Sequence, residues 1–220
     1  QIFCRIRVNK IAIITATYNR ASLLQNLWKS LCVQKYCDFV WYIIDDGSTD
    51  DTKNAIARFN DDSDFEIKYF HQKNSGKQAA ISFAFASVIE PWLVVIDSDD
   101  YLTNDALRIM HESIGQANDN VMSLAFHRSY RDGKITGDSF YKEFGTYIQR
   151  INDGVEGDKV CLHRTEACRG FSNPIFPNEN FIAEMTFFIW FSRNNLTQFI
   201  NEPVVITSYL DKGLTNNSIA

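Results

Sequence analysis

Hydrophobic and polar positions form two alternating kinds of pattern along the first half of the chain. Short apolar runs, rich in β-branched and aromatic residues, predict strands that are buried on both faces of a sheet. Between these runs, apolar residues recur at helical spacing, as in Leu23, Leu27 and Leu31. This alternation predicts an α/β domain with a mainly parallel sheet, right-handed crossovers and helices on both faces. A helix is expected after each of the four predicted strands, 10–17, 39–44, 65–71 and 92–96.

Short polar side chains stand where three of the helices should begin. Ser22 precedes the first helical pattern, Ser48 or Thr49 the second, and Thr165 a later short helix. Hydroxyl groups at such positions accept hydrogen bonds from the first free backbone N–H groups of a helix. We therefore expect these side chains to act as N-caps.

The pattern is weaker after residue 120. Val121–His127 and 157–163 predict strands, Arg131–Lys134 a hairpin turn, and 204–209 a last strand. A strongly apolar helix is expected over 181–193, whereas 141–155 has no clear period and stays unassigned. No linker or repeat interrupts the chain. We expect one domain over 1–220, in which a first half (10–115) carries the main site and a second half (116–220) completes it.

Acidic residues directly follow two of the predicted strands. Asp45 and Asp46 end the second strand, and Asp97, Asp99 and Asp100 follow the fourth. The carboxyl ends of parallel strands meet at one edge of a sheet, where ligands bind. Carboxylate oxygens gathered there suit Mg²⁺ or Mn²⁺. A solvated acidic turn that starts the next helix is the alternative, and we favour it for Asp100 alone.

Composition and charge narrow the function classes. The net charge is −5 and no basic run is present, which argues against nucleic acid as the main partner. No apolar stretch is long enough to span a membrane. Five cysteines without a Cys-x-x-Cys pair indicate reduced thiols. These features predict a cytoplasmic protein, with peripheral attachment at the inner face of the cell membrane left open.

Four short motifs, each at a predicted strand end, carry a family resemblance: TATYNR (15–20), DDGSTD (45–50), NSGK (74–77) and DSDD (97–100). In this order and spacing they resemble the family 2 glycosyltransferases, which are inverting enzymes of the GT-A fold. The resemblance is close over 10–107 and looser beyond. Ser82 and Met185 depart from it, since relatives usually carry Asn and an acid there. The Gln-x-x-Arg-Trp motif of processive synthases is absent.

The resemblance implies a nucleotide-sugar donor, UDP-linked, and a glycan or lipid-linked acceptor in cell-surface polysaccharide synthesis. It also implies a D-x-D metal motif, in which Asp99 is a ligand of Mg²⁺ or Mn²⁺ and Asp97 shares the ion or faces the ribose. Asp45, with Asp46 as its alternative, would accept a hydrogen bond from the nucleobase. Further donor-binding positions implied by the motifs are Thr15, Ala16, Thr17, Tyr18, Arg20, Gly76, Lys77 and Ser98.

For Tyr18, Arg20 and Lys77, the residues alone are also compatible with a structural role. Tyr18 could be ordinary wall packing, and the two cations could be surface charges beside helix starts. The four histidines are scattered along the chain without the spacing of metal ligands, and we interpret them as structural or surface residues.

Inversion by direct displacement needs a carboxylate that removes the proton from the acceptor hydroxyl. Candidates in the second half are Asp158, Glu179 and Glu184. Glu184 precedes apolar residues at helical spacing, so a helix start next to apolar walls would hold it and raise its pKa. The family resemblance also favours Glu184 as the catalytic base.

Other functions remain as alternatives at this point. A sugar-phosphate nucleotidyltransferase would need a Gly-rich basic loop after the first strand, but Thr15–Arg20 contains no glycine. A phospho-receiver domain would carry its acidic pair after the first strand. A nucleotide-sugar-binding protein without catalytic activity stays open.

Overall fold

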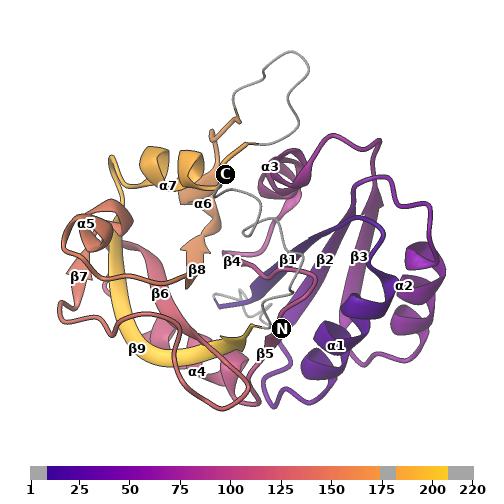
Figure 1. Ribbon diagram of the computed structural model, residues 1–220, viewed down its shortest axis with the longest axis horizontal. Helices are drawn as coiled ribbons and strands as arrows, with labels where there is room; N and C mark the ends of the chain where they lie inside the picture. The colour runs from indigo at the N-terminus through magenta and orange to yellow at the C-terminus, as the bar shows by residue number, and fades with distance from the viewer. Residues whose placement is uncertain (1–8, 174–181, 208–220) are drawn as a thin grey trace, which may run out of the picture.

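The computed structural model describes residues 9–173 and 182–207. Within these residues nine strands form one mixed sheet, and seven helices lie on its faces (Figure 1). The strands are β1 (Ile11–Thr17), β2 (Phe39–Asp45), β3 (Glu66–His71), β4 (Trp92–Val95), β5 (Tyr101–Leu102), β6 (Val121–Ser129), β7 (Phe144–Gly145), β8 (Lys159–Arg164) and β9 (Leu196–Ile206). The helices are α1 (Ala21–Cys32), α2 (Thr52–Asp61), α3 (Lys77–Ser87), α4 (Ala106–Gln116), α5 (Tyr147–Asn152), α6 (Thr165–Cys168) and α7 (Met185–Phe191).

The first half is a parallel sheet in the order β3-β2-β1-β4. Every residue of β2 is buried, which explains why its sequence is apolar without alternation. One face packs against α1, α2 and α4, and the other against α3, α6 and α7. Because the strands run in the same direction, the turns after β1, β2 and β4 all lie at one edge of the sheet.

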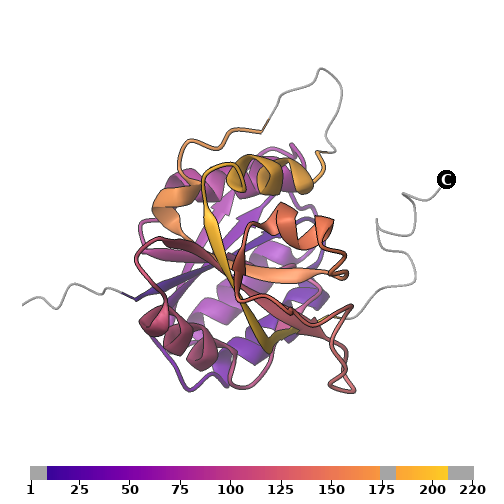
Figure 2. The same cartoon turned by 90° about the vertical axis from the view of Figure 1, so that its left-hand side faces the viewer.

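The second half extends the same sheet with strands of mixed direction. β8 is antiparallel to β4, β6 is antiparallel to β8, and β9 is parallel to β6. β9 is long and strongly curved, and it crosses beside β5 at the sheet edge (Figures 1 and 2). Its pairing with β6 shifts register near His127. The curvature brings the second half around the edge where the acidic turns lie.

Several local predictions were wrong. Ser22 lies inside α1, whose N-cap is Arg20, and α2 is preceded by Asp51 rather than by Ser48 or Thr49. Thr165 is the first residue of α6, and its hydroxyl donates to the backbone oxygen of Glu90 at 2.5 Å. Ser48 accepts from the backbone N–H of Asn19, so tertiary contacts override the local preference at Ser48 and Thr165. Ser22 is exposed within α1.

The unassigned segment 141–155 contains β7 and α5. Helix α5 begins with a reciprocal capping box between Thr146 and Gln149. Helix α7 is shorter than the predicted 181–193, and residue 181 lies outside the described residues. β9 begins at Leu196, well before the predicted 204, while 208 and 209 are not described. No helix in the described ranges combines the length and apolar character needed to cross a membrane.

Candidate active site

Asp46 closes the turn after β2 and ties it to the start of α3. One carboxylate oxygen accepts from the Gln72 side-chain amide at 2.7 Å and from the backbone N–H of Ser75 at 2.9 Å. The other accepts from the backbone N–H of Gly76 at 2.8 Å. The residue is only 3% exposed. Its carboxylate is therefore engaged in holding the loop that precedes α3.

Asp45, beside it, is also buried but makes fewer bonds. Its two oxygens accept from the backbone N–H of Ser48 and from the Tyr69 hydroxyl, each at 2.8 Å. Burial raises the pKa of Tyr69, and the bonded Asp45 carboxylate raises it further, so the phenol stays a donor. Each oxygen keeps acceptor capacity, which a nucleobase N–H could use.

The turn after β1 is joined to the turn after β2 through Asn19. Its side-chain oxygen accepts from the backbone N–H groups of Thr49 and Asp50, and its own N–H donates to Ser48 Oγ. Asn19 has a φ of 53°, which asparagine tolerates better than most residues. The neighbouring Tyr18 is 48% exposed at this edge. A ring held there can form one wall of a nucleotide pocket.

The end of β1 presents backbone rather than side chains. Thr15 is fully buried and its hydroxyl accepts from the Trp41 indole N–H at 3.0 Å. Thr17 is also buried, and Ala16 is half-buried. These three residues can therefore line a base pocket through their backbone.

The turn after β4 differs because cations hold its acids. Lys77 Nζ lies 2.7 Å from an Asp97 oxygen, and Arg20 lies 3.2 Å from Asp99. Arg20 also donates to the Ser98 hydroxyl at 3.1 Å. These cations come from the start of α3 and the start of α1. The predicted grouping of Arg20, Lys77 and the acidic turn at one edge is therefore present.

Arg128 on β6 is the third cation, and the sequence analysis did not anticipate it. It is paired with Asp100 and lies 4.0 Å from Asp97. Asp100 was expected to serve a helix start, but β5 follows it and its partner is Arg128, so that expectation was wrong. A charged residue just past the predicted strand 121–127 was the available signal.

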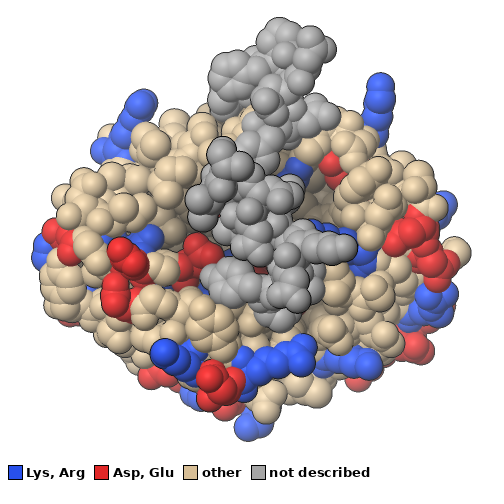
Figure 3. Space-filling model, viewed as in Figure 1, with Lys and Arg blue, Asp and Glu red and all other residues tan. Residues whose placement is uncertain are grey.

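The balance of burial and charge fixes the ionisation of Asp97. Burial by itself would raise the pKa of its carboxyl, but Lys77 and Arg128 outweigh burial and hold the pKa below its usual value. Burial would likewise lower the pKa of Lys77, and the carboxylates of Asp97 and Glu184 raise it instead. Both groups are therefore charged at neutral pH. Elsewhere on this face Figure 3 shows acidic and basic side chains interspersed over the described residues.

The acidic turn offers only part of a binding site for a divalent cation. In the described part of the chain, no three His, Cys, Asp or Glu side chains are grouped as a metal site. Mg²⁺ and Mn²⁺ need less from the protein, because one or two carboxylates are commonly completed by water and substrate phosphates. Asp97 and Asp99 are partly exposed and offer only oxygen atoms. They fit a metal that binds together with a diphosphate.

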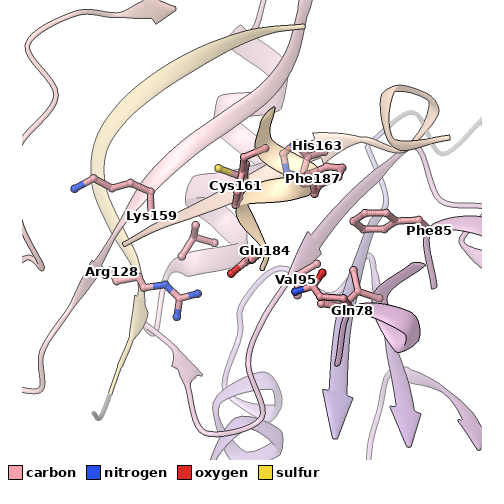
Figure 4. Close-up of a pocket in the computed structure, with 12 residues that line it drawn as sticks. Gln78, Phe85, Val95, Arg128, Lys159, Cys161, His163, Glu184 and Phe187 are labelled. Atoms are coloured by element: carbon pink, nitrogen blue, oxygen red, sulfur yellow. The ribbon is translucent and has the colours of Figure 1, made fainter. Parts of the chain in front are cut away.

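Glu184 lies across the edge from the acidic turn, directly before α7. Solvent reaches it at the mouth of a pocket that is lined by residues of α3, β4, β8 and α7 (Figure 4). Desolvation within this concave surface raises the pKa of its carboxyl, and the Asp97 carboxylate adds to the rise, while Lys77 opposes it. The helix start and apolar surroundings predicted for Glu184 are confirmed, but its role stays a prediction.

The other two candidates for the base are placed differently. Asp158 directly precedes β8 and is exposed. Glu179 lies outside the described residues. Of the candidates whose positions are described, Glu184 is the one that lines the pocket.

Comparison with known proteins identifies the family. Residues 12–178 match the family model described as glycosyl transferase family 2. An uncharacterized glycosyltransferase of Rickettsia conorii is 30% identical over 72% of this chain and 24% of its own length. The teichoic acid poly(glycerol phosphate) polymerase of Staphylococcus epidermidis is 24% identical over 89% of this chain and 28% of its own length. The chain therefore spans about a quarter of these two relatives.

Two solved structures share the fold. S. aureus TarS in complex with UDP-GlcNAc aligns with a TM-score of 0.74 at 19% identity, covering 96% of this chain and 62% of that one. The mannosyltransferase PcManGT of Pyrobaculum calidifontis, in complex with GDP-Man and Mn²⁺, aligns with a TM-score of 0.69 at 17% identity. This alignment covers 92% of this chain and 58% of that one. The predicted GT-A fold is confirmed, and the nucleotidyltransferase and receiver alternatives are set aside. The chain belongs to glycosyltransferase family 2.

Proposed function

We propose that this chain moves a sugar from a nucleotide-diphosphate sugar, UDP-linked, to an acceptor hydroxyl with inversion at the anomeric carbon. One observation carries the proposal. The Lys77 ammonium lies 2.7 Å from Asp97 in the acidic turn after β4 and also acts electrostatically on Glu184, so the turn and Glu184 lie close to the same cation. We assign the acidic turn to the leaving group and Glu184 to the acceptor, with the Lys77 ammonium close to both.

The donor binds along the edge formed by β1, β2 and β4. Tyr18 and the backbone of 15–17 line the base pocket, and Asp45 accepts from the base. Arg20, Lys77 and the backbone N–H groups at Gly76 and the start of α3 face the diphosphate, where cations and a helix N-terminus favour negative charge. The UDP–sugar complex of TarS supports a uridine donor for this fold.

Asp99, with Asp97, would hold Mg²⁺ or Mn²⁺, which neutralises charge on a diphosphate leaving group. The Mn²⁺ complex of PcManGT supports this assignment. Lys77 and Arg20 supply positive charge at the same place and orient the diphosphate.

Glu184 acts on the other side of the sugar. Its carboxylate removes the proton from the acceptor hydroxyl while that oxygen attacks the anomeric carbon. The bond from this carbon to the diphosphate oxygen breaks, and the electron pair leaves with the diphosphate. A carboxyl whose pKa is raised by desolvation is a stronger base than an ordinary glutamate.

The acceptor class follows from the relatives rather than from the site. We propose a glycan or lipid-linked glycan of the cell surface, reached from the cytoplasmic side of the membrane. The teichoic acid polymerase among the relatives supports a surface-polymer substrate.

Replacing Glu184 with glutamine tests the proposal. Glu184→Gln keeps the shape and removes the base, so turnover of a UDP-sugar should fall about 10²–10⁴-fold. Metal-dependent UDP binding, measured by calorimetry, should be retained. Asp158→Asn is the matched control and should keep most activity. Near-parental turnover by Glu184→Gln would remove the base assignment, and no UDP binding by the parent protein would remove the donor assignment.

The pH dependence of activity in the parent protein and in Glu184→Gln provides a second test of the base assignment. The base works only when it is deprotonated, and the pKa of Glu184 is raised. Activity should therefore fall with decreasing pH at values above those typical of a solvated glutamate. In Glu184→Gln this acidic limb should disappear from the residual rate.

A further inference from the structure

The pocket below Glu184 has a predominantly aromatic and aliphatic wall. Phe85 of α3 and Phe187 and Phe188 of α7 form most of it, together with Ile81 and Val95 (Figure 4). The ring centroids of Phe85 and Phe187 are 5.1 Å apart, so the two helices meet there. The enclosed cavity volume is about 30 Å³. This is room for roughly two water-sized groups, not for a sugar ring.

Gln78 brings an amide into this apolar pocket. The residue is 7% exposed, and no hydrogen bond joins its side chain to any residue that the structure describes. Only its backbone oxygen is used, as the acceptor of the Asn173 side-chain amide at 2.7 Å. In Figure 4 the Gln78 amide points into the pocket toward Glu184. An amide with unused donor and acceptor groups at the pocket surface favours a ligand that both donates and accepts.

Two further polar groups of the lining are neutral, whereas Arg128 and Lys159, which also line the pocket, are cations. His163 is buried, and its Nδ1 finds no hydrogen-bond partner within the described residues. Burial lowers the pKa of His163 to about 3 and raises the pKa of the Cys161 thiol to about 12. Both side chains are uncharged at neutral pH. Where His163 contacts Phe187, the pocket therefore offers neutral hydrogen-bonding groups beside apolar surface.

We propose that this pocket binds the acetamido group on C2 of the transferred sugar, so that the donor is a nucleotide-linked N-acetylhexosamine. The inference rests on the proposed function. Glu184 at the pocket mouth acts next to the anomeric carbon, so a group inside the pocket is attached to the neighbouring carbon. The acetyl carbonyl and methyl groups match the two water-sized groups that fit. The amide pairs with Gln78, and the methyl group packs on Phe85 and Phe187.

The pocket belongs to the donor side of the site. Gln78 follows Lys77, which binds Asp97, and Val95 precedes the acidic turn on β4. A substituent of the acceptor would approach from the opposite side of Glu184. Binding of donor alone should therefore already fill the pocket.

Two other substituents fit less well. A carboxylate would lie beside the Glu184 carboxylate and be repelled by it. Arg128 is already paired with Asp97 and Asp100, and the Lys159 ammonium points away from Glu184 and donates to the backbone oxygens of Thr136 and Asp138 (Figure 4). A hydroxyl group would leave the apolar wall without a contact. The acetamido group satisfies both the amide and the wall.

Calorimetry with Mn²⁺ and no acceptor tests the inference on the full chain. UDP-N-acetylglucosamine should bind at least tenfold more tightly than UDP-glucose, whereas UDP should bind independently of the sugar pocket. Gln78→Leu should reduce the preference to threefold or less and leave UDP affinity unchanged. Gln25→Leu makes the same change at an exposed position of α1 and should keep the preference.

A measurement on the parent protein alone guards against a variant that fails to fold. Because the cavity is small, UDP-N-butyrylglucosamine should bind at least fivefold more weakly than the N-acetyl donor. Equal affinity of the parent protein for UDP-glucose and UDP-N-acetylglucosamine, with UDP bound normally, would overturn the inference and leave the proposed function standing. A parent protein that binds no UDP would overturn both.

Discussion

The two acidic turns lie at the same edge of the sheet but are stabilised in different ways. After β2, Asp45 and Asp46 accept hydrogen bonds from neutral donors, namely backbone N–H groups, a tyrosine and a glutamine. After β4, Asp97 and Asp99 are paired with the charged side chains of Lys77 and Arg20. The acids have the same chemistry, and only their partners differ.

These partners indicate which turn is fixed and which can exchange its partners. Backbone donors belong to the loop itself and cannot leave without unfolding it. Lys77 and Arg20 are long, partly exposed side chains whose ammonium and guanidinium groups can move to a phosphate. We infer that the first turn is a rigid frame for the nucleoside, and that the second is neutralised by cations until a metal and a diphosphate take their places.

The largest expected effect concerns Asp46. Asp46→Ala removes three part-buried hydrogen bonds to a charged group, so the free energy of unfolding should fall by about 3–5 kcal/mol. Urea denaturation measures this change. Asp99→Ala is the control from the second turn, and its loss should stay below about 1 kcal/mol because the Arg20 pair is partly exposed. Equal losses in the two variants would erase the distinction between the turns.

The next effect concerns Asp45, which belongs to the fixed turn but keeps acceptor capacity. Asp45→Ala should weaken UDP binding by about 1.5–3 kcal/mol, the usual contribution of a hydrogen bond to a charged group. Calorimetry with UDP, CDP and GDP measures both the affinity and the preference among bases. The variant should also discriminate less strongly between UDP, CDP and GDP. If UDP affinity is unchanged, Asp45 belongs with Asp46 as a purely structural residue.

The first half of the fold could be predicted from sequence because its signals are local. The buried strands β1, β2 and β4 are continuous apolar runs followed by polar motifs, so they and the acidic turns after β2 and β4 were placed correctly. β3 was also located, although it is a partly exposed strand at the end of the sheet. Helix caps were placed less well. Ser22 and Thr165 have the right chemistry for caps, but the N-cap positions of α1 and α6 are occupied by Arg20 and Arg164.

The second half depends on pairings that no local pattern reveals. β9 pairs with strands on both sides, and α5 is too short to show a period. Arg128 and Gln78 reach the site only because β6 and α3 are brought to the same edge. Arg128 stands outside every motif, and Gln78 directly follows the NSGK motif without being part of it. Glu184 was identifiable because its helix start and the following phenylalanines form a local pattern.

The smallest effect concerns Arg20 and tests whether the second turn exchanges partners. Arg20 lies 3.2 Å from Asp99, and its side chain is 34% exposed. A partly exposed pair of this kind contributes up to about 1 kcal/mol, which is roughly a fivefold factor in affinity. Arg20→Gln should therefore raise the affinity for Mn²⁺ without nucleotide by up to about fivefold, as measured by electron paramagnetic resonance.

With UDP present, Arg20→Gln should weaken binding instead of strengthening it, because the same guanidinium group is proposed to bind the diphosphate. Arg20→Gln should then bind UDP more weakly than the parent protein in Mn²⁺ buffer. Arg108→Gln removes an exposed arginine of α4 that is paired with Glu112 and should change neither affinity. Both effects of Arg20→Gln should shrink as salt is added, since screening weakens partly exposed pairs. Weaker Mn²⁺ binding by Arg20→Gln without nucleotide would mean that Arg20 supports the metal site instead of competing for Asp99.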